Sequence, residues 1–335
     1  MLLLRDIFGQ DDAVRQLRSA WQSDRLPHGL IFAGPPGVGK GTAAGAVAAW
    51  FLCEQPGSDD ACGKCASCHL VSAGTHPDYH VIYRQLIRLD PRKKDHKASV
   101  LSIDLIENYL MDPAARKAMQ GRGKVFIIEE AELLSRDAGN SMLKTLEEPQ
   151  GRTLIILLTD QLHSLLPTIR SRCQSVRFGS LPDALVIEKL TQRGANADDA
   201  EMATVVASGS LGLASRWIED GIIERARQLH DLLNAILGGK GAEVFPAWIA
   251  TAGADYAAKQ EERDANISKD QTTREGIILY LRLAADNLRA RLADADAAQQ
   301  MRLCHIIDDL AQGQTYIDGN VNTGLVLEHL ANRFK

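Results

Sequence analysis

The chain has few aromatic residues and no long hydrophobic run. Phe, Trp and Tyr make up 5% of its 335 residues. No apolar run reaches the roughly 18 residues of a membrane span, and Met1 to Asp6 is too short for the apolar core of a signal peptide. We therefore expect a cytoplasmic protein with no membrane partner. Disulfides are rare in that compartment, so clustered thiols there indicate metal ligands or redox groups.

An excess of positive charge is also absent. Lys and Arg number 38 against 43 Asp and Glu, which gives a formal net charge of −5. This balance does not favour nucleic-acid binding over the whole surface, so any DNA contact requires a local basic patch. Residues 84–97 form such a stretch, but it lacks the aromatic residues that bind single strands. We interpret it as a solvated loop, with phosphate contact as the alternative.

The first half of the chain alternates strand and helix patterns. Apolar runs predict buried strands at residues 30–33, 123–130 and 154–159, and helical patterns lie between them at residues 42–52, 103–110 and 138–146. This alternation is typical of a parallel α/β sheet, whose ligands bind at the carboxyl ends of the strands.

The second half carries only helical patterns. From Pro182 onward the chain is rich in Ala and Leu, and apolar residues recur at helical spacing in a stripe made of Ile277, Leu281, Ala285, Leu288 and Leu292. A chain of this length exceeds one core, so we expect several domains. The predicted boundaries are 1–179 for an α/β domain, 180–221 for a small helical domain and 222–335 for a larger all-α domain.

A glycine-rich loop follows the first predicted strand. Gly34-Pro35-Pro36-Gly37-Val38-Gly39-Lys40 has the form of a phosphate-binding loop, in which backbone N–H groups and the lysine contact phosphate oxygens. The usual next residue is Ser or Thr, whose hydroxyl binds Mg²⁺, but here it is Gly41, with Thr42 one place later. Nucleotide binding is therefore predicted, and metal-assisted hydrolysis is in doubt. The alternative is a strand-to-helix turn with a purely structural role.

Polar residues also end the next two predicted strands. Glu129 and Glu130 end the second strand, where a carboxylate can bind Mg²⁺ or activate a water, and Thr159 ends the third strand. These residues and the loop fall at the same edge of the predicted sheet. The alternative is that the two glutamates are solvated acids at a strand end.

Four of the six cysteines are clustered directly after the helix that follows the loop. Their spacing is Cys53-x8-Cys62-x2-Cys65-x2-Cys68. Four thiolates complete a tetrahedral shell around Zn²⁺ and leave no open position for catalysis, so the pattern predicts a structural zinc site. The alternative is four reduced thiols without a metal. Cys173 and Cys304 stand apart, and we expect both to be small buried residues.

Further motifs complete a resemblance that covers nearly the whole chain. They are Pro27-His28-Gly29-Leu30, Thr75-His76-Pro77-Asp78, Lys144-Thr145-Leu146-Glu147-Glu148-Pro149, Ser171-Arg172-Cys173 and Asn320-Val321-Asn322-x2-Leu325. With the loop and the cysteines, they resemble the clamp-loader subunits of bacterial DNA polymerase III. The resemblance implies an AAA+ P-loop domain with a zinc knuckle, a helical lid and a C-terminal helical collar. It also implies a five-subunit ring with gamma/tau and delta subunits, which places the sliding clamp on primed DNA.

Two kinds of clamp-loader subunit fit, the ATP-hydrolysing motor and a stator that need not hydrolyse. Gly41 lacks the Mg²⁺-binding hydroxyl, and Gly212 stands where an active subunit carries a phosphate-sensing Arg. Both residues favour the stator, which would bind ATP or ADP weakly or without hydrolysing it. The resemblance makes Arg172 the arginine finger that a stator offers to the neighbour's ATP. The alternative is an arginine that caps a helix or pairs with an acid. An independent P-loop enzyme, either a motor ATPase or a nucleotide kinase, is the rival function.

Overall fold

The chain divides into two compact units. The computed structural model describes residues 3–89, 100–120, 122–264 and 267–334. The first unit consists of Met1–Arg193 and Ala207–Leu213, and the second of Gly194–Val206 and Ala214–Lys335. The three-domain division expected from the sequence stays a prediction. Within the described residues, no helix is long and apolar enough to cross a membrane.

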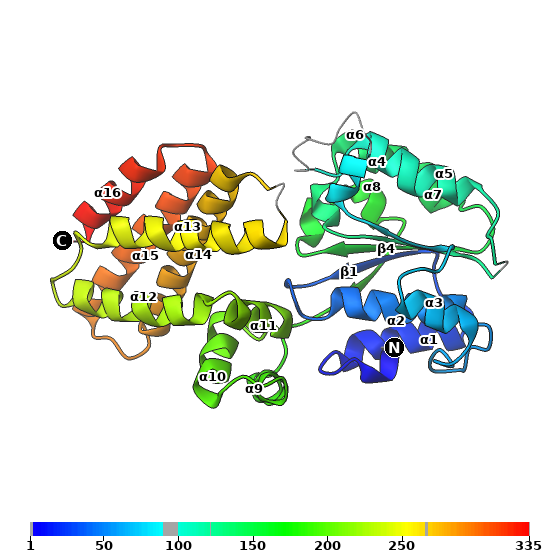
Figure 1. The fold of residues 1–335 in the computed structure, drawn as a ribbon, viewed down its shortest axis with the longest axis horizontal. Helices are drawn as coiled ribbons and strands as arrows, with labels where there is room; N and C mark the ends of the chain where they lie inside the picture. The colour runs from blue at the N-terminus through cyan, green and yellow to red at the C-terminus, as the bar shows by residue number, and fades with distance from the viewer. Residues whose placement is uncertain (1–2, 90–99, 121, 265–266, 335) are drawn as a thin grey trace. The chain divides into compact units, whose positions relative to one another are not determined.

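The first unit is built on a parallel five-stranded sheet (Figure 1). Its strands are β1 (Gly29–Ala33), β2 (Tyr79–Ile82), β3 (Lys124–Ile128), β4 (Thr153–Thr159) and β5 (Gln174–Arg177), in the order β2-β3-β4-β1-β5. The three predicted strands, β1, β3 and β4, are confirmed and form the centre of the sheet. The two strands that the sequence did not predict are the edge strands, which are shorter and less apolar.

Helices cover both faces of this sheet. Those of the first unit are η1 (Leu4–Asp6), α1 (Asp11–Gln22), α2 (Lys40–Leu52), α3 (Ala66–Ser72), η2 (Arg84–Leu89), α4 (Ile103–Ile106), η4 (Glu107–Met111), α5 (Asp112–Ala115), η5 (Ala131–Leu133), α6 (Arg136–Ser141), α7 (Leu143–Glu147), η6 (Leu162–Ser164), α8 (Pro167–Arg170) and α9 (Asp183–Gln192). In Figure 1, α1, α2 and α3 lie on one face, and α4, α6, α7 and α8 on the other. The three predicted helices are confirmed, two of them as consecutive shorter segments.

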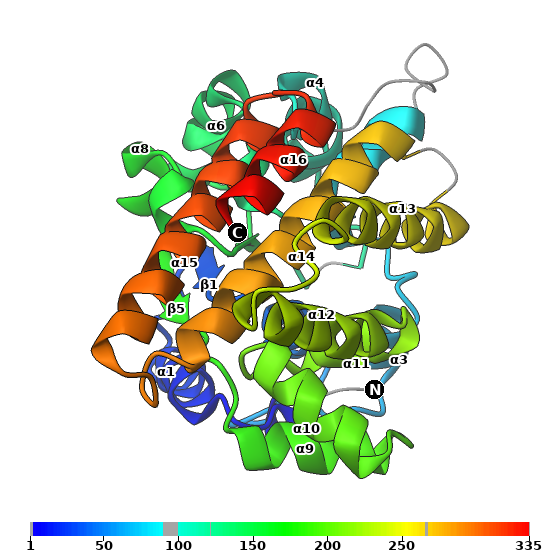
Figure 2. The same ribbon diagram turned by 90° about the vertical axis from the view of Figure 1, so that its left-hand side faces the viewer.

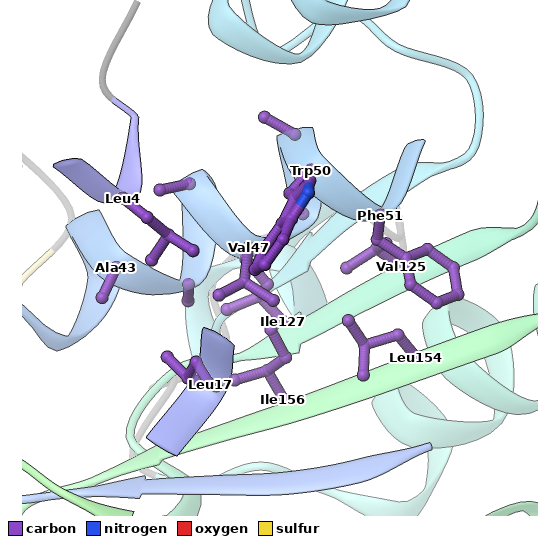
Figure 3. Packing of buried hydrophobic residues seen from close by; sticks show 14 of the residues in the cluster. Leu4, Leu17, Ala43, Val47, Trp50, Phe51, Val125, Ile127, Leu154 and Ile156 are labelled. Carbon is purple, nitrogen blue, oxygen red and sulfur yellow. The ribbon is translucent and has the colours of Figure 1, made fainter. Parts of the chain in front are cut away.

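Alternate residues of each central strand enter two separate cores. Val125, Ile127, Leu154 and Ile156 pack against α2, where Trp50 is fully buried (Figure 3). The intervening residues of β3 and β4 pack against the helices of the opposite face. Because successive side chains of a strand point to opposite faces, a sheet covered on both sides requires the continuous apolar runs seen in the sequence.

The second unit is helical in its described part. Its helices are α10 (Ala197–Val206), most of α11 (Leu211–Glu219), α12 (Ile222–Leu237), α13 (Phe245–Arg263), α14 (Lys269–Ala290), α15 (Ala297–Asp318) and α16 (Thr323–Arg333). Helix α13 packs against α14 and α16, and α15 packs against the same two, so the four form a bundle (Figure 2). In the predicted stripe of α14, Ile277, Leu281, Ala285 and Leu288 are buried.

Candidate functional site

The glycine-rich loop connects β1 to the N-terminus of α2. Gly37 and Gly39 have φ angles of +73° and +102°, which side-chain-bearing residues rarely adopt. Gly34 follows the buried strand and donates its N–H to the Thr159 carbonyl oxygen at 3.2 Å. The loop therefore presents the backbone amides at the start of α2, an arrangement that favours an anion.

A small cavity adjoins this loop within the first unit. Gly37, Gly39 and Thr42 line it, together with Phe8 and Gly212 among others. Its volume is about 180 Å³. Sites that enclose small ligands usually measure roughly 300–1,000 Å³, so this cavity must widen to enclose a nucleotide.

Lys40 does not reach into the cavity. Its ammonium group donates to the carbonyl oxygens of Gly34 and Pro35 and to Asp160 Oδ1, each at 2.6 Å. The side chain is only 8% exposed, so these three acceptors replace most of its hydration. Asp160 was not predicted as a site residue, although it is an acid directly after β4. A phosphate group would have to compete with this ion pair for the lysine.

The segment before α11 contacts the loop through its backbone. Ser210 Oγ donates to the Pro36 carbonyl oxygen at 2.6 Å, and Gly212 N–H donates to the Gly37 carbonyl oxygen at 2.9 Å. A Cβ atom on Gly212 would lie 2.9 Å from both the Cα and the carbonyl oxygen of Gly37. The position where the resemblance predicts an arginine in an active subunit is therefore too close to the loop for a side chain in this arrangement.

The predicted acids lie at the carboxyl end of β3. Glu130 has a left-handed backbone, with φ of +50°, and its Oε2 forms an ion pair with Arg84 Nε at 2.9 Å. Part of the Glu129 side chain reaches solvent, but nearby protein atoms desolvate its carboxyl group and raise its pKa, and the charge on Glu130 adds to this shift. Arg84 belongs to the predicted basic stretch, whose residues 90–97 lie outside the described part of the chain.

The four clustered cysteines converge on one point. All four sulfurs lie within 4.8 Å of one another, and the distances Cys53 Sγ to Cys65 Sγ and Cys62 Sγ to Cys68 Sγ are both 3.9 Å. Zinc–sulfur bonds of about 2.3 Å in a tetrahedron place the sulfurs about 3.8 Å apart. None of the four forms a disulfide. The donor set therefore fits a tetrahedral metal ion of the zinc type.

Local backbone structure holds these sulfurs in place. Cys53 follows α2, and Cys65 caps the N-terminus of α3 by accepting from the Cys68 N–H at 3.4 Å. The pKa of Cys62 is lowered to about 6, first by the backbone N–H of Lys64. Burial raises the pKa of both Cys53 and Cys68. Bound metal favours the thiolate form of all four.

The remaining two cysteines have different surroundings. Cys173 is buried, as expected, and burial raises the pKa of its thiol to about 12. Cys304 is exposed, so the expectation that it is buried is wrong. Its position lies on the solvent side of α15, whose apolar residues contact the bundle.

Arg172 lies just after α8, at the surface of the first unit. Its Nε donates to Glu147 Oε1 at 2.5 Å, and its Nη1 donates to the Thr168 carbonyl oxygen at 3.0 Å. The side chain is still 34% exposed. The pairing with an acid that the sequence left open is thus present in the isolated chain. Arg172 does not line the cavity beside the phosphate loop.

Comparison with known proteins adds an independent finding. Residues 9–182 match the model of a family described as DNA polymerase III, delta subunit. The chain belongs to this family. Similar curated proteins include two named DNA polymerase III subunit delta': that of Pseudomonas aeruginosa strain PAO1 is 33% identical over 63% of this chain and 61% of its own length, and that of Escherichia coli K12 is 29% identical over 88% and 86%.

A motor-type protein and a solved structure are also similar. DNA polymerase III subunit tau of Bacillus subtilis strain 168 is 30% identical over 65% of this chain and 35% of its own length. A gamma-subunit-related protein of Thermotoga maritima aligns over 96% of this chain and 98% of its own, at 15% identity and a TM-score of 0.48.

In this family member, the fold brings together only part of the predicted nucleotide site. Gly37, Gly39 and Thr42 share one cavity, whereas Lys40 is turned away from it. Thr159 is buried, and its hydroxyl oxygen accepts from the Gln161 N–H at 3.0 Å. The roles assigned to these residues stay predictions.

Proposed function

We propose that this chain is the delta-prime stator of a bacterial clamp loader. It assembles with gamma/tau and delta subunits in a ring of five that opens the sliding clamp and places it on primed DNA. The observation that carries this proposal is the pocket beside the phosphate loop. Within a family of polymerase III subunits, this member keeps the loop but lacks two groups that hydrolysis uses.

The first missing group is a hydroxyl next to the lysine. Gly41 offers no oxygen for Mg²⁺ at the position where P-loop ATPases use Ser or Thr. The second is a cationic side chain at Gly212, where the loop backbone leaves no space. ATP or ADP therefore binds weakly, through the loop amides and Lys40 after its release from Asp160, and is not hydrolysed.

Arg172 acts in trans. Its side chain is exposed and does not line the cavity beside the phosphate loop of its own chain. The phosphate that it contacts therefore belongs to the ATP of a neighbouring subunit. Its planar guanidinium stabilises charge on the γ-phosphoryl group as that group is transferred. Glu147 holds the side chain near its working orientation before the ring assembles.

The four cysteines bind one structural Zn²⁺. Cys53, Cys62, Cys65 and Cys68 fill all four positions, so the ion has no catalytic role. The metal instead fixes α3 against the end of α2.

The test is ATP hydrolysis and clamp loading by a complex assembled from the gamma/tau, delta and clamp proteins of the same organism. Arg172→Ala should leave assembly intact and lower both activities in part. A finger is worth about 10³–10⁵ in rate, but only one of several sites loses it. Arg172→Lys should recover little of the loss, because an ammonium lacks the planar fork.

The matched control is Arg15→Ala, which removes an exposed, ion-paired arginine elsewhere in the same unit. It should behave as wild type. Equal loading rates for wild type and Arg172→Ala, with assembly confirmed and ATP saturating, would return Arg172 to a structural role.

The second candidate is an ATP-hydrolysing subunit of the gamma/tau type. The similarity of this chain to the Bacillus tau protein favours this candidate, since tau and the family of this chain are both named as subunits of DNA polymerase III. Steady ATP turnover by the isolated chain that disappears in Lys40→Ala would favour this candidate over the stator.

A further inference from the structure

The second unit contains a cavity of about 560 Å³. It lies where the ends of α12 and α14 meet the start of α15, since residues of these three helices and of the α14–α15 connection line it. The apolar part of its lining includes Leu237 and Leu303. The polar part consists of His230, Asn287, Arg291 and Arg302, among others. A volume in this range, with a few convergent polar groups, is typical of small-ligand sites.

Both arginines in this wall contact only neutral acceptors. Arg291 donates to Asn234 Oδ1 at 2.7 Å and to His230 Nδ1 at 3.2 Å. Arg302 donates to the carbonyl oxygen of Leu237 at 3.0 Å. Within the described residues, neither has a carboxylate oxygen within 4.0 Å, and this includes Asp294, which also lines the cavity.

Other arginines of the same unit are neutralised. Arg225, Arg289 and Arg333 each form an ion pair with an aspartate. Arg291, in contrast, is partly desolvated without a counter-ion, and this burial lowers the pKa of its guanidinium. Since a guanidinium stays charged at neutral pH, the wall carries two cations whose charge no described acid balances by direct contact.

An unused acceptor stands beside these cations. Asn287 Nδ2 and Arg291 both direct donors at His230 Nδ1, so this nitrogen accepts. Protein atoms cover the amide oxygen of Asn287, which has no hydrogen-bond donor among the described residues. Because solvent does not reach this oxygen, a ligand in the cavity does not contact it in this structure, and the two guanidinium groups supply the polar contacts for an anion.

We propose that this cavity binds a small oxyanion-bearing ligand, with a carboxylate or phosphate held by Arg291 and Arg302. Guanidinium groups match the geometry of both oxyanions. The site lies in the second unit and uses none of the residues that carry the proposed stator function.

The test is isothermal titration of the full chain at constant ionic strength with two probes. Inorganic phosphate represents phosphate-bearing ligands, and N-acetyl-aspartate amide represents carboxylates. One of them should bind saturably with one site that depends on Arg291, and the better probe identifies the source. Any phosphate bound at the glycine-rich loop is common to all variants and cancels in the comparison.

Arg291→Gln and, separately, Arg302→Gln should each weaken that binding at least tenfold. Gln at 291 can still hydrogen-bond Asn234 or His230, and Arg302→Gln keeps the test available should the first variant fold poorly. Arg289→Gln is the matched control, because Arg289 precedes Arg291 by two residues and does not line the cavity. Absence of saturable binding by both probes, or equal affinity in wild type and both cavity variants, would overturn the site.

Discussion

At the scale of single residues, Gly212 matters because it has no side chain where the loop backbone passes closely. By resemblance alone, this glycine is a lost phosphate sensor that an arginine could restore. In the structure its backbone is hydrogen-bonded to Gly37 and the two glycines are in direct contact. The same residue therefore removes a cation and permits the loop to pack closely against the segment before α11.

We predict that Gly212→Arg leaves ATP turnover of the isolated chain at background. Gly212→Ala should lower the free energy of unfolding by about 1–3 kcal/mol, because overpacking displaces the loop backbone. Gly179→Ala is the control, since a Cβ there would meet no atom within 4 Å, and it should change stability by less than about 0.5 kcal/mol. Phosphate release and urea unfolding measure the two effects. Gained turnover in Gly212→Arg would contradict the prediction.

The pair formed by Arg172 and Glu147 gives a second test. Glu147→Gln should reduce clamp loading by the assembled complex less than Arg172→Ala does, because it loosens the guanidinium without removing it. Both side chains are partly exposed, so the free energy of unfolding should change by less than about 1 kcal/mol. Loading assays and urea unfolding of the isolated variant measure these outcomes. A loss as large as that of Arg172→Ala would mean that Glu147 has a role of its own.

At the scale of elements, the cysteine cluster supports a helix that is too short to be stable alone. Helix α3 has seven residues, fewer than an isolated helix needs in water. It depends on the Cys65 cap and on Ser67, whose hydroxyl donates to the Leu52 carbonyl oxygen at 2.7 Å. In the proposed function, a bound metal adds the remaining constraint by joining α3 to the end of α2.

We predict one zinc per chain and a local response to its removal. Chelation should release the ion and raise amide hydrogen exchange over residues 53–72, while the central strands β1, β3 and β4 stay protected by their two cores. Cys65→Ser should give the same exchange pattern without a chelator, and Cys304→Ser should match wild type. Mass spectrometry of the exchanged protein measures this. Uniform loss of protection across the sheet would show that the ion stabilises the whole first unit.

The two isolated cysteines should react with thiol reagents at very different rates. At pH 8 a thiol whose pKa is about 12 is thiolate in about one molecule in ten thousand, and only the thiolate reacts. Because the pKa is raised, reactivity of Cys173 stays low until the pH approaches this value or the unit unfolds. Iodoacetamide should therefore label Cys304 first. Early labelling of Cys173 in folded protein would show that the core around it opens readily.

At the scale of the whole molecule, the predicted functional parts are distributed between the two units. The first carries the phosphate loop, the cysteine cluster and Arg172, and the second carries the helical bundle. In the proposed function none of these parts turns over substrate by itself, and a phosphate that Arg172 contacts belongs to another subunit.

We predict that the isolated chain hydrolyses ATP at background rates, which Lys40→Ala does not change. Equilibrium titration with a fluorescent ATP analogue should give weak binding that Asp160→Asn strengthens, because the lysine is then released from an ion pair. Glu147→Gln removes a carboxylate elsewhere in the same unit and should leave nucleotide affinity unchanged. Weaker binding in Asp160→Asn would show that the carboxylate supports the nucleotide rather than competing with it.

Local sequence patterns predicted the central strands, three of the helices around them, the glycine-rich loop and the cysteine set. These depend on neighbours in the chain: apolar runs mark β1, β3 and β4, and the spacing of Cys62, Cys65 and Cys68 brings three sulfurs close together at the start of α3. The edge strands β2 and β5 were missed because they are short and mixed in polarity, so their partners decide that they form.

How distant residues use these parts depends on the folded chain. The contact of Gly212 with Gly37, the capture of Lys40 by Asp160 and the pairing of Arg172 with Glu147 join positions that are 25 or more residues apart. The unbalanced arginines of the second unit likewise share a cavity only because α12, α14 and α15 meet there. Residue type and spacing predict which chemistry is available. Whether a side chain can carry out that chemistry depends on its distances to other groups, which are set when the chain folds and its buried polar groups find partners.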